Sequence, residues 1–449
     1  MVSLTTTAAE RSSIGKSAGA ETPIYITLIQ VLAGSAAEQR IAIRKLRRQW
    51  QASYVTPLAE ILRLNTDAEV QHMIVALLER KTGKRFGANY QRWHRWAWSQ
   101  KPEPIENYAG FKSWLYGNID PRFKRYFTSG HPPEIRLDEV LWGGVSQDGI
   151  PPLRHPKLVT ADAADYLADS DVVFAHEING EYRAYPKRIM GWHEMVIETV
   201  GDIELVGVYC TLCGAMIIYE TRHDGVLHKF GTSGFLYRSN KLMYDKETQS
   251  LWNTFWGRPV IGPLTGKGIS LKRRSIVTTT WGEWKSRHPQ TSVLSLDTGY
   301  DVDYGEGVAY RDYFSTDKLM FDVPTRDKRL KNKAEILGIV MDGLERPDYQ
   351  PLAIAATFLA ENPIYYDHVG DKKIVVLTDT SGANRVFVAD VEYVKWDGIR
   401  NLVDIQGVMW EMSESGLTSA NGQKRERIPA HRAFWFGWYA AFNNTRLVH

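Results

Sequence analysis

The chain has 449 residues, and its composition, 43% hydrophobic and 24% charged, is typical of soluble globular proteins. At roughly 100–200 residues per domain, this length predicts about three domains. A formal net charge of only +3 gives no indication of nucleic acid or of an anionic membrane surface as a partner. The sequence also contains no apolar run of about 18 residues that would predict a transmembrane helix.

The first 22 residues are rich in Ser, Thr, Ala and Gly and contain no apolar segment of the kind found in secretory signals. Residues 1–22 are therefore predicted to form a disordered tail. Without a visible signal peptide, the default expectation is a cytoplasmic protein.

Residues 23–100 show the apolar spacing of helices, for example at Ile26, Ile29 and Leu32. Thr56-Pro57 marks the first turn of a further helix, because proline is tolerated there. The paired short helices resemble HEAT-like α-solenoid repeats, which implies a scaffold region that could dock a protein partner. The next segment, 101–156, contains Pro-Pro and Gly-Gly pairs and is predicted to be an irregular connector.

The remainder of the chain is predicted to be rich in strands and contains an internal repeat. Residues 191–220 align without gaps on residues 360–389, and upstream Asn179-Gly180 has a counterpart in Asp342-Gly343. Tryptophans downstream also correspond: Trp252 with Trp410, and Trp281 and Trp284 with Trp435 and Trp438. The predicted fold is therefore α+β, with a helical region followed by a mainly β body. That body is expected to consist of two tandem related repeats, 157–325 and 326–449, packed about a pseudo-two-fold axis.

The two cysteines of the chain, Cys210 and Cys213, lie three residues apart and are followed by Gly214. Thiols at this spacing can share a metal ion, form a small disulfide ring or act as a redox pair. A thioredoxin-type pair would stand between a strand and a helix, whereas the apolar residues 215–219 predict a strand. This context favours a metal knuckle over the other two alternatives.

The second repeat lacks the polar residues that accompany these cysteines. His193 and Glu194 fall on Asn362 and Pro363, and the two cysteines fall on Asp379 and Gly382. Joint loss of these residue types indicates that only the first repeat carries a site. We expect His193, Cys210 and Cys213 to be metal ligands, and Glu194, Cys210 and Cys213 to be catalytic, with Glu194 orienting the imidazole or moving protons. The alternative for His193 is that it packs at the end of a short helix.

Other side chains are weaker candidates for this site. Met216 could be a soft ligand for copper, but it lies on a predicted apolar strand. Ser233-Gly234 and Asn240 stand in a polar segment that could face a substrate or simply form a turn. The remaining histidines in this region are expected to be ordinary strand or surface residues: His176, His223 and His228.

Residues from Gly149 to about Asp312 resemble the uncharacterised bacterial family DUF3179. The similarity rests on a set of short motifs: Asp148-Gly149-Ile150-Pro151, 179–186, Trp192-His193-Glu194, 209–214, Met243-Tyr244-Asp245 and Ser250-Leu251-Trp252. Thr211 replaces the proline that the family usually has between the cysteines. The C-terminal repeat is similar to the second half that such proteins commonly carry. The resemblance implies no particular activity, and it implies a periplasmic or exported location as the alternative to the cytoplasm.

These observations predict a metal- or thiol-dependent protein acting on an unknown small molecule or protein. As an enzyme it would use copper or iron for redox chemistry, or zinc as a Lewis acid. The alternative is a non-catalytic metal-handling or partner-binding scaffold in which the cysteine pair is structural. Neither a Walker A motif nor a G-x-G-x-x-G turn after a strand is present, and Ser233 lacks the surroundings of a hydrolase nucleophile.

Overall fold

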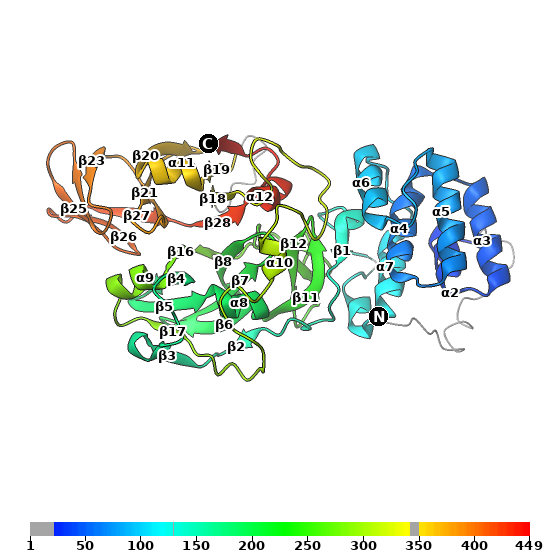
Figure 1. Ribbon diagram of the computed structural model, residues 1–449, viewed down its shortest axis with the longest axis horizontal. Helices are drawn as coiled ribbons and strands as arrows, with labels where there is room; N and C mark the ends of the chain where they lie inside the picture. Colours follow the sequence, from blue (N-terminus) through cyan, green and yellow to red (C-terminus); the bar gives the residue numbers. More distant parts are fainter. Residues whose placement is uncertain (1–21, 129, 342–349) are drawn as a thin grey trace.

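The computed structural model describes residues 22–128, 130–341 and 350–449. A helical region occupies one end of the molecule and a mainly β body occupies the rest (Figure 1). The predicted tail up to residue 21, and the Asp342-Gly343 turn of the second repeat, lie outside the described residues. No helix in the described part of the chain has both the length and the apolar character needed to cross a membrane.

The N-terminal region is helical, as the apolar spacing predicted, and several of its helices begin or end at residues typical of helix caps. Ser35 and Glu38 form a reciprocal capping box, Asp67 accepts hydrogen bonds from the amides of the next helix, and Gly83 ends that helix in the left-handed conformation. The helices are α2 (Ile24–Ala33), α3 (Ala36–Arg48), α4 (Val55–Leu64), α5 (Ala68–Thr82), α6 (Tyr90–Gln100) and α7 (Tyr108–Gly117).

Helical structure extends beyond residue 100, into the segment expected to be irregular. Helix α7 lies there, followed by a 3-10 turn at Pro121–Arg125. The Asn107 side chain caps α7 by accepting a hydrogen bond from Gly110 N (3.1 Å). Its buried face, Tyr108, Phe111 and Leu115, has the helical spacing that the flanking prolines and glycines obscured in the sequence.

A buried ion pair attaches the helices to the β body. Glu60 on α4 and Lys112 on α7 are 1% and 0% exposed, and their side chains lie 3.0 Å apart. The Lys112 ammonium also donates to the Val140 carbonyl (2.7 Å) at the start of β1 (Val140–Trp142). Tyr108 and Tyr116 donate their hydroxyl protons to the same carboxylate, so that the buried charges are fully hydrogen-bonded.

The β body has a first half, up to about residue 325, and a second half. The first half consists of β2 (Leu153–Arg154), β3 (Leu158–Thr160), β4 (Val172–Ile178), β5 (Glu181–Pro186), α8 (Lys187–His193), β6 (Met195–Val200), β7 (Ile203–Cys210), β8 (Ala215–Glu220), β9 (Arg222–His223), β10 (Val226–Leu227), β11 (Phe230–Tyr237), β12 (Asn240–Asp245), β13 (Leu251–Asn253), β14 (Arg258–Ile261), β15 (Arg273–Arg274), β16 (Val277–Thr280), α9 (Trp281–Arg287), β17 (Ser292–Leu294) and α10 (Arg311–Phe314).

The second half lies beside the first and ends at the C-terminus (Figure 1). It consists of β18 (Glu335–Ile339), β19 (Leu352–Ala355), α11 (Ala356–Glu361), β20 (Ile364–Val369), β21 (Lys372–Thr378), β22 (Asn384–Val388), β23 (Tyr393–Trp396), β24 (Asn401–Asp404), β25 (Met409–Met412), β26 (Gly416–Ser419), β27 (Lys424–Ile428), β28 (Ala430–Phe434), α12 (Trp435–Ala441) and β29 (Arg446–Val448).

The two halves have corresponding strand orders. One sheet of the first half has the order β16-β4-β5-β17-β3, and one sheet of the second half has the order β28-β18-β19-β29. The pairs β5–β17 and β19–β29 are both parallel, whereas the other neighbours in these sheets are antiparallel. Three antiparallel strands follow α8 in the first half, β6-β7-β8, and three follow α11 in the second half, β20-β21-β22.

The tryptophan-rich helices also correspond. The indole of Trp284 on α9 donates to Thr291 Oγ1 (2.9 Å), and the indole of Trp438 on α12 donates to Thr445 Oγ1 (3.0 Å). Both indoles are buried and bind a threonine seven residues downstream, immediately before the parallel strand. An equivalent hydrogen bond from a tryptophan indole to a threonine therefore holds α9 and α12 against their sheets.

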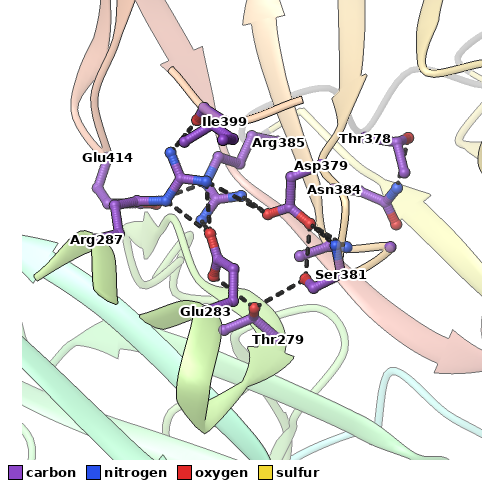
Figure 2. A network of polar contacts seen from close by, with 12 residues as sticks. Thr279, Glu283, Arg287, Thr378, Asp379, Ser381, Asn384, Arg385, Ile399 and Glu414 are labelled. Atoms are coloured by element: carbon purple, nitrogen blue, oxygen red, sulfur yellow. Dashed lines mark hydrogen bonds and ion pairs between the residues drawn. The ribbon is translucent and has the colours of Figure 1, made fainter. Parts of the chain in front are cut away.

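A buried ion network joins the halves (Figure 2). Arg385 on β22, 1% exposed, donates to Glu414 Oε1 (2.8 Å) and to Asp379 Oδ2 (2.7 Å), and it lies 3.7 Å from Glu283 on α9 of the first half. Arg287 on α9 donates to Glu283 Oε1 (2.7 Å). Because each buried charge has opposite charges as neighbours, the network is stable only when complete.

Loss of the Glu414 charge is expected to destabilise the β body strongly. The Glu414→Gln variant leaves Arg385 and Arg427 without their shared carboxylate, at a cost of about 3–5 kcal/mol in the free energy of unfolding. The matched control is Glu69→Gln, which breaks the exposed Arg40–Glu69 pair and should cost at most about 1 kcal/mol. Urea unfolding of both variants measures the difference, and equal costs would contradict the assignment.

The stability of the Glu414→Gln variant should depend less on acid pH than the stability of the wild type. Although burial opposes ionisation, Arg385 and Arg427 hold the pKa of Glu414 well below its usual value. A carboxylate whose pKa is depressed by folding contributes stability above its unfolded pKa and loses this contribution as the pH falls toward the folded pKa. The stability difference between wild type and Glu414→Gln should therefore shrink as the pH falls below the ordinary carboxyl pKa of 4.5.

Candidate functional site

The two cysteines lie on the turn that connects β7 to β8. Cys213 N donates to the Cys210 carbonyl (3.1 Å), and Cys210 pairs with Ala215 across the hairpin. Gly214 closes the turn at a φ of 60°, a left-handed conformation that glycine adopts without a steric penalty. The turn thus places both thiols in the interior, where they are 3% and 0% exposed.

Both sulfurs share one backbone acceptor. Cys213 Sγ lies 3.5 Å and Cys210 Sγ 3.9 Å from the Ser239 carbonyl, and Asn240 Nδ2 donates to Cys213 Sγ (3.7 Å). Arg238 and Ser239 form the β11–β12 turn, and both have positive φ, 49° and 66°. Such turns favour Gly and Asn, so two larger residues there carry a backbone cost. The Cys pair is free rather than disulfide-bonded.

The thiols have different acidities. Burial alone would raise the pKa of Cys210, but hydrogen bonds from the Cys213 thiol and from the Lys241 backbone outweigh it, and the pKa is lowered. Burial and the neighbouring Cys210 sulfur raise the pKa of Cys213 well above its usual value. This difference favours ionisation of Cys210 before Cys213.

Glu194 reaches the cysteine turn from the end of α8. The Glu194 backbone adopts the left-handed conformation, with a φ of 55°, and the residue is 4% exposed. Its Oε1 accepts hydrogen bonds from the Thr211 hydroxyl (2.6 Å), between the cysteines, and from the Tyr310 hydroxyl (3.1 Å). Its Oε2 forms an ion pair with Lys241, which compensates the buried negative charge next to Cys210.

His193 is directed away from the thiols. Its Nδ1 lies 2.9 Å from the Pro151 carbonyl and its Nε2 2.5 Å from the Tyr304 hydroxyl, so both ring nitrogens have partners. Among residues 22–128, 130–341 and 350–449, no group of three or more His, Cys, Asp or Glu side chains is arranged to hold a metal ion. The structure thus brings Glu194 to Cys210 and Cys213 but does not bring His193 there, and the expected three-ligand site is not assembled.

Three other side chains considered from the sequence pack in the core or bind neighbouring side chains. Met216 is buried in the core, His176 Nε2 lies 3.0 Å from the Tyr185 hydroxyl, and His228 Nδ1 lies 2.9 Å from Asp245 Oδ2. Sequence reasoning missed two members of the thiol site, the Ser239 carbonyl and Lys241. The available signal was Asn240 between them, in the polar segment already noted.

The second half of the chain covers the thiols. The Phe434 amide on β28 donates to the Cys213 carbonyl (2.7 Å). Gly437 on α12 lies so close to the turn that a Cβ at this position would stand 3.0 Å from the Cys213 sulfur. A Cβ on Gly214 would similarly meet the Phe434 ring at 3.0 Å. The site is therefore completed by residues far away in the sequence.

The second half has an equivalent turn without thiols. Gly382 N donates to the Asp379 carbonyl (2.9 Å), just as Cys213 N donates to the Cys210 carbonyl. These four residues are the ones that the internal alignment places opposite each other. In the second half the position of Cys210 is taken by Asp379, which binds Arg385 in the buried ion network (Figure 2).

Comparison with protein-family models matches residues 147–445 to the family described as "Protein of unknown function (DUF3179)". The match includes the thiol turn, Glu194, the first half of the β body and the second half up to the residue before β29. Comparisons with curated proteins and with solved structures find no similar protein.

Removing the Cys213 thiol is expected to raise the pKa of Cys210. The Cys213→Ala variant loses the hydrogen bond that stabilises the Cys210 thiolate, while the burial that disfavours the thiolate remains. The pH at which alkylation of Cys210 by iodoacetamide reaches half its maximal rate should therefore move upward. Peptide-resolved mass spectrometry over a pH series measures this rate.

The conservative control is Cys213→Ser, whose hydroxyl can still donate to the Cys210 sulfur. We expect its half-maximal pH to lie closer to that of the wild type than the value for Cys213→Ala. Identical profiles for the wild type and Cys213→Ala would show that the neighbouring thiol does not set the acidity of Cys210.

Proposed function

Because the chain belongs to the DUF3179 family and the matched segment contains both of its cysteines, we propose that it is a thiol-dependent redox protein. In this proposal Cys210 and Cys213 interconvert between a dithiol and a disulfide. The observation that carries the proposal is the common environment of the two sulfurs, which share the Ser239 carbonyl as acceptor on one tight turn.

The reaction partner is a small disulfide. The Cys210 thiolate attacks one sulfur of the partner and releases one thiol, and Cys213 then displaces the second thiol as the Cys210–Cys213 bond forms. The partner is reduced by two electrons and gains two protons, and the protein loses the same number. Since the cysteines are 3% and 0% exposed, a folded protein disulfide is too large to reach them, whereas a small molecule needs only a limited opening.

The buried polar residues around the turn favour this step. The Cys213 thiol and the Lys241 amide stabilise the attacking thiolate. The Lys241 ammonium is paired with Glu194, and this pairing limits the repulsion between the Glu194 carboxylate and the thiolate. Glu194 in turn fixes Thr211, the residue between the two cysteines.

We further propose that the two halves of the β body are related repeats and that only the first retains a reactive site. The corresponding strand orders, the two Trp–Thr hydrogen bonds and the equivalent turn hydrogen bonds support this relationship. In the second repeat the Asp379 turn contributes to the ion network instead of to chemistry.

The proposal is tested by equilibrating the full chain with mixtures of reduced and oxidised glutathione, followed by alkylation and intact-mass measurement. The reduced protein should take up two alkyl groups, whereas the oxidised protein should take up none and should be lighter by about 2 Da, the mass of two hydrogens. In Cys213→Ala the reaction should stop at a mixed disulfide of Cys210 with glutathione, because the resolving thiol is missing.

Two outcomes would favour other functions. Two alkylated cysteines at every glutathione ratio would sink the redox proposal and leave the pair structural. About one equivalent of a transition metal in anaerobically purified protein, lost in Cys210→Ser, would instead favour metal handling, because thiolates are the ligands that copper(I) and zinc prefer.

A further inference from the structure

A second candidate site lies between the segment around β2 and the loop after β17. It is a pocket of about 470 Å³, lined by residues 148 and 151–157 and by the loop 297–300. This volume lies within the range of small-molecule sites. The pocket is formed entirely by the first half of the β body and contains neither cysteine.

The charges along the pocket leave one cation available for a ligand. The guanidinium of Arg154 donates to the Phe230 carbonyl (2.8 Å), and no further acceptor for it occurs in the described part of the chain. Lys157 is paired with Asp297, with 2.5 Å between ammonium and carboxylate. Lys246 lies near Arg154, and partial burial together with repulsion from this guanidinium lowers the pKa of Lys246.

The remaining carboxylate of the pocket does not neutralise Arg154 directly. Asp148 Oδ1 accepts a hydrogen bond from Thr232 N (3.0 Å), and its Oδ2 accepts one from the Tyr244 hydroxyl (2.6 Å). A bidentate anion, a carboxylate or a phosphate, is the natural partner for the free N–H groups of a guanidinium.

A chain of hydrogen bonds determines whether the Thr298 hydroxyl, in the loop 297–300, donates or accepts toward Tyr304. The Pro151 carbonyl can only accept, so His193 Nδ1 carries a proton and donates to it (2.9 Å). Burial lowers the pKa of His193, which keeps the ring neutral and leaves Nε2 as an acceptor. The Tyr304 hydroxyl therefore donates to Nε2 (2.5 Å), and Thr298 must donate to the Tyr304 oxygen (2.7 Å).

Thr298 consequently presents an acceptor in the pocket wall. Its hydroxyl proton is engaged by Tyr304, and one lone pair accepts a hydrogen bond from Tyr300 N (3.2 Å). A hydroxyl oxygen has two lone pairs, so one remains for a ligand. The group that satisfies it is a hydrogen-bond donor such as a hydroxyl.

We propose that this pocket binds a small organic anion that also carries a hydroxyl group. Arg154 binds the carboxylate or phosphate, and the Thr298 oxygen accepts the hydroxyl proton of the ligand. His193 and Tyr304 act as positioning residues, because they fix the direction in which the Thr298 proton points. The site is independent of the proposed thiol chemistry, and the Cys210→Ala variant should bind the same ligands unchanged.

Calorimetric titration of the full chain with two matched ligand pairs tests the proposal. Malate and succinate differ by one hydroxyl in the carboxylate series, and glycerol 3-phosphate and propyl phosphate differ only in hydroxyls in the phosphate series. The series that binds identifies the anionic group. Within it, we expect the hydroxylated member to bind about tenfold more tightly, the effect of one well-made hydrogen bond.

Three variants separate specific binding from general attraction to a basic surface. Arg154→Gln should weaken binding about tenfold or more, whereas Arg80→Gln, an exposed arginine in the helical region, should leave it unchanged. Thr298→Val keeps the side-chain shape and removes the acceptor, so it should abolish the preference for the hydroxylated ligand. This last variant decides the question even if Arg154→Gln fails to fold.

The proposal would be overturned by the absence of binding for all four ligands at concentrations up to about 10 mM. Equal affinities for the members of each pair in the wild type would also overturn it. Equal losses of affinity in Arg154→Gln and Arg80→Gln would show that the ligand is attracted by general positive charge and not by this pocket. An unchanged preference for the hydroxylated ligand in Thr298→Val would show that Thr298 does not bind the hydroxyl.

Discussion

The arrangement of the β body depends on the buried ion network around Arg385. Charges that have left water are tolerated only when each has a partner, and here Glu283 belongs to the first half whereas Arg385, Asp379 and Glu414 belong to the second. The halves must therefore adopt one relative position. That position also brings β28 and α12 over the cysteine turn, so the ion network helps to fix the surroundings of the thiols.

Glu194 and the preceding residue, His193, contact different parts of the first half. Glu194 ends α8 with a positive φ, which directs its side chain to Thr211 and Lys241. The preceding residue, His193, is directed to Pro151 and Tyr304. Two neighbours in the sequence therefore serve different regions, and a substitution of one is expected to leave the site of the other largely intact.

Much of the architecture could be predicted from the sequence, because it rests on periodicity and on self-similarity. The helical spacing indicated the N-terminal region, and the internal alignment placed Cys210 opposite Asp379, whose backbone forms the same turn. The partners of His193 could not be predicted, because Pro151 and Tyr304 are brought to its ring by the tertiary fold from 42 and 111 residues away in the sequence. The role of Ser239 was equally hidden, since its contribution is a carbonyl oriented by the backbone rather than a side chain.

The close approach of Gly437 to the Cys213 sulfur constrains what can change in α12. Helix α12 of the second half provides part of the surface that buries Cys213. A side chain at position 437 would stand 3.0 Å from the Cys213 sulfur, so even an alanine there would force the cysteine turn or α12 to shift. Residues of the second half therefore contribute to the environment of thiols that lie in the first half.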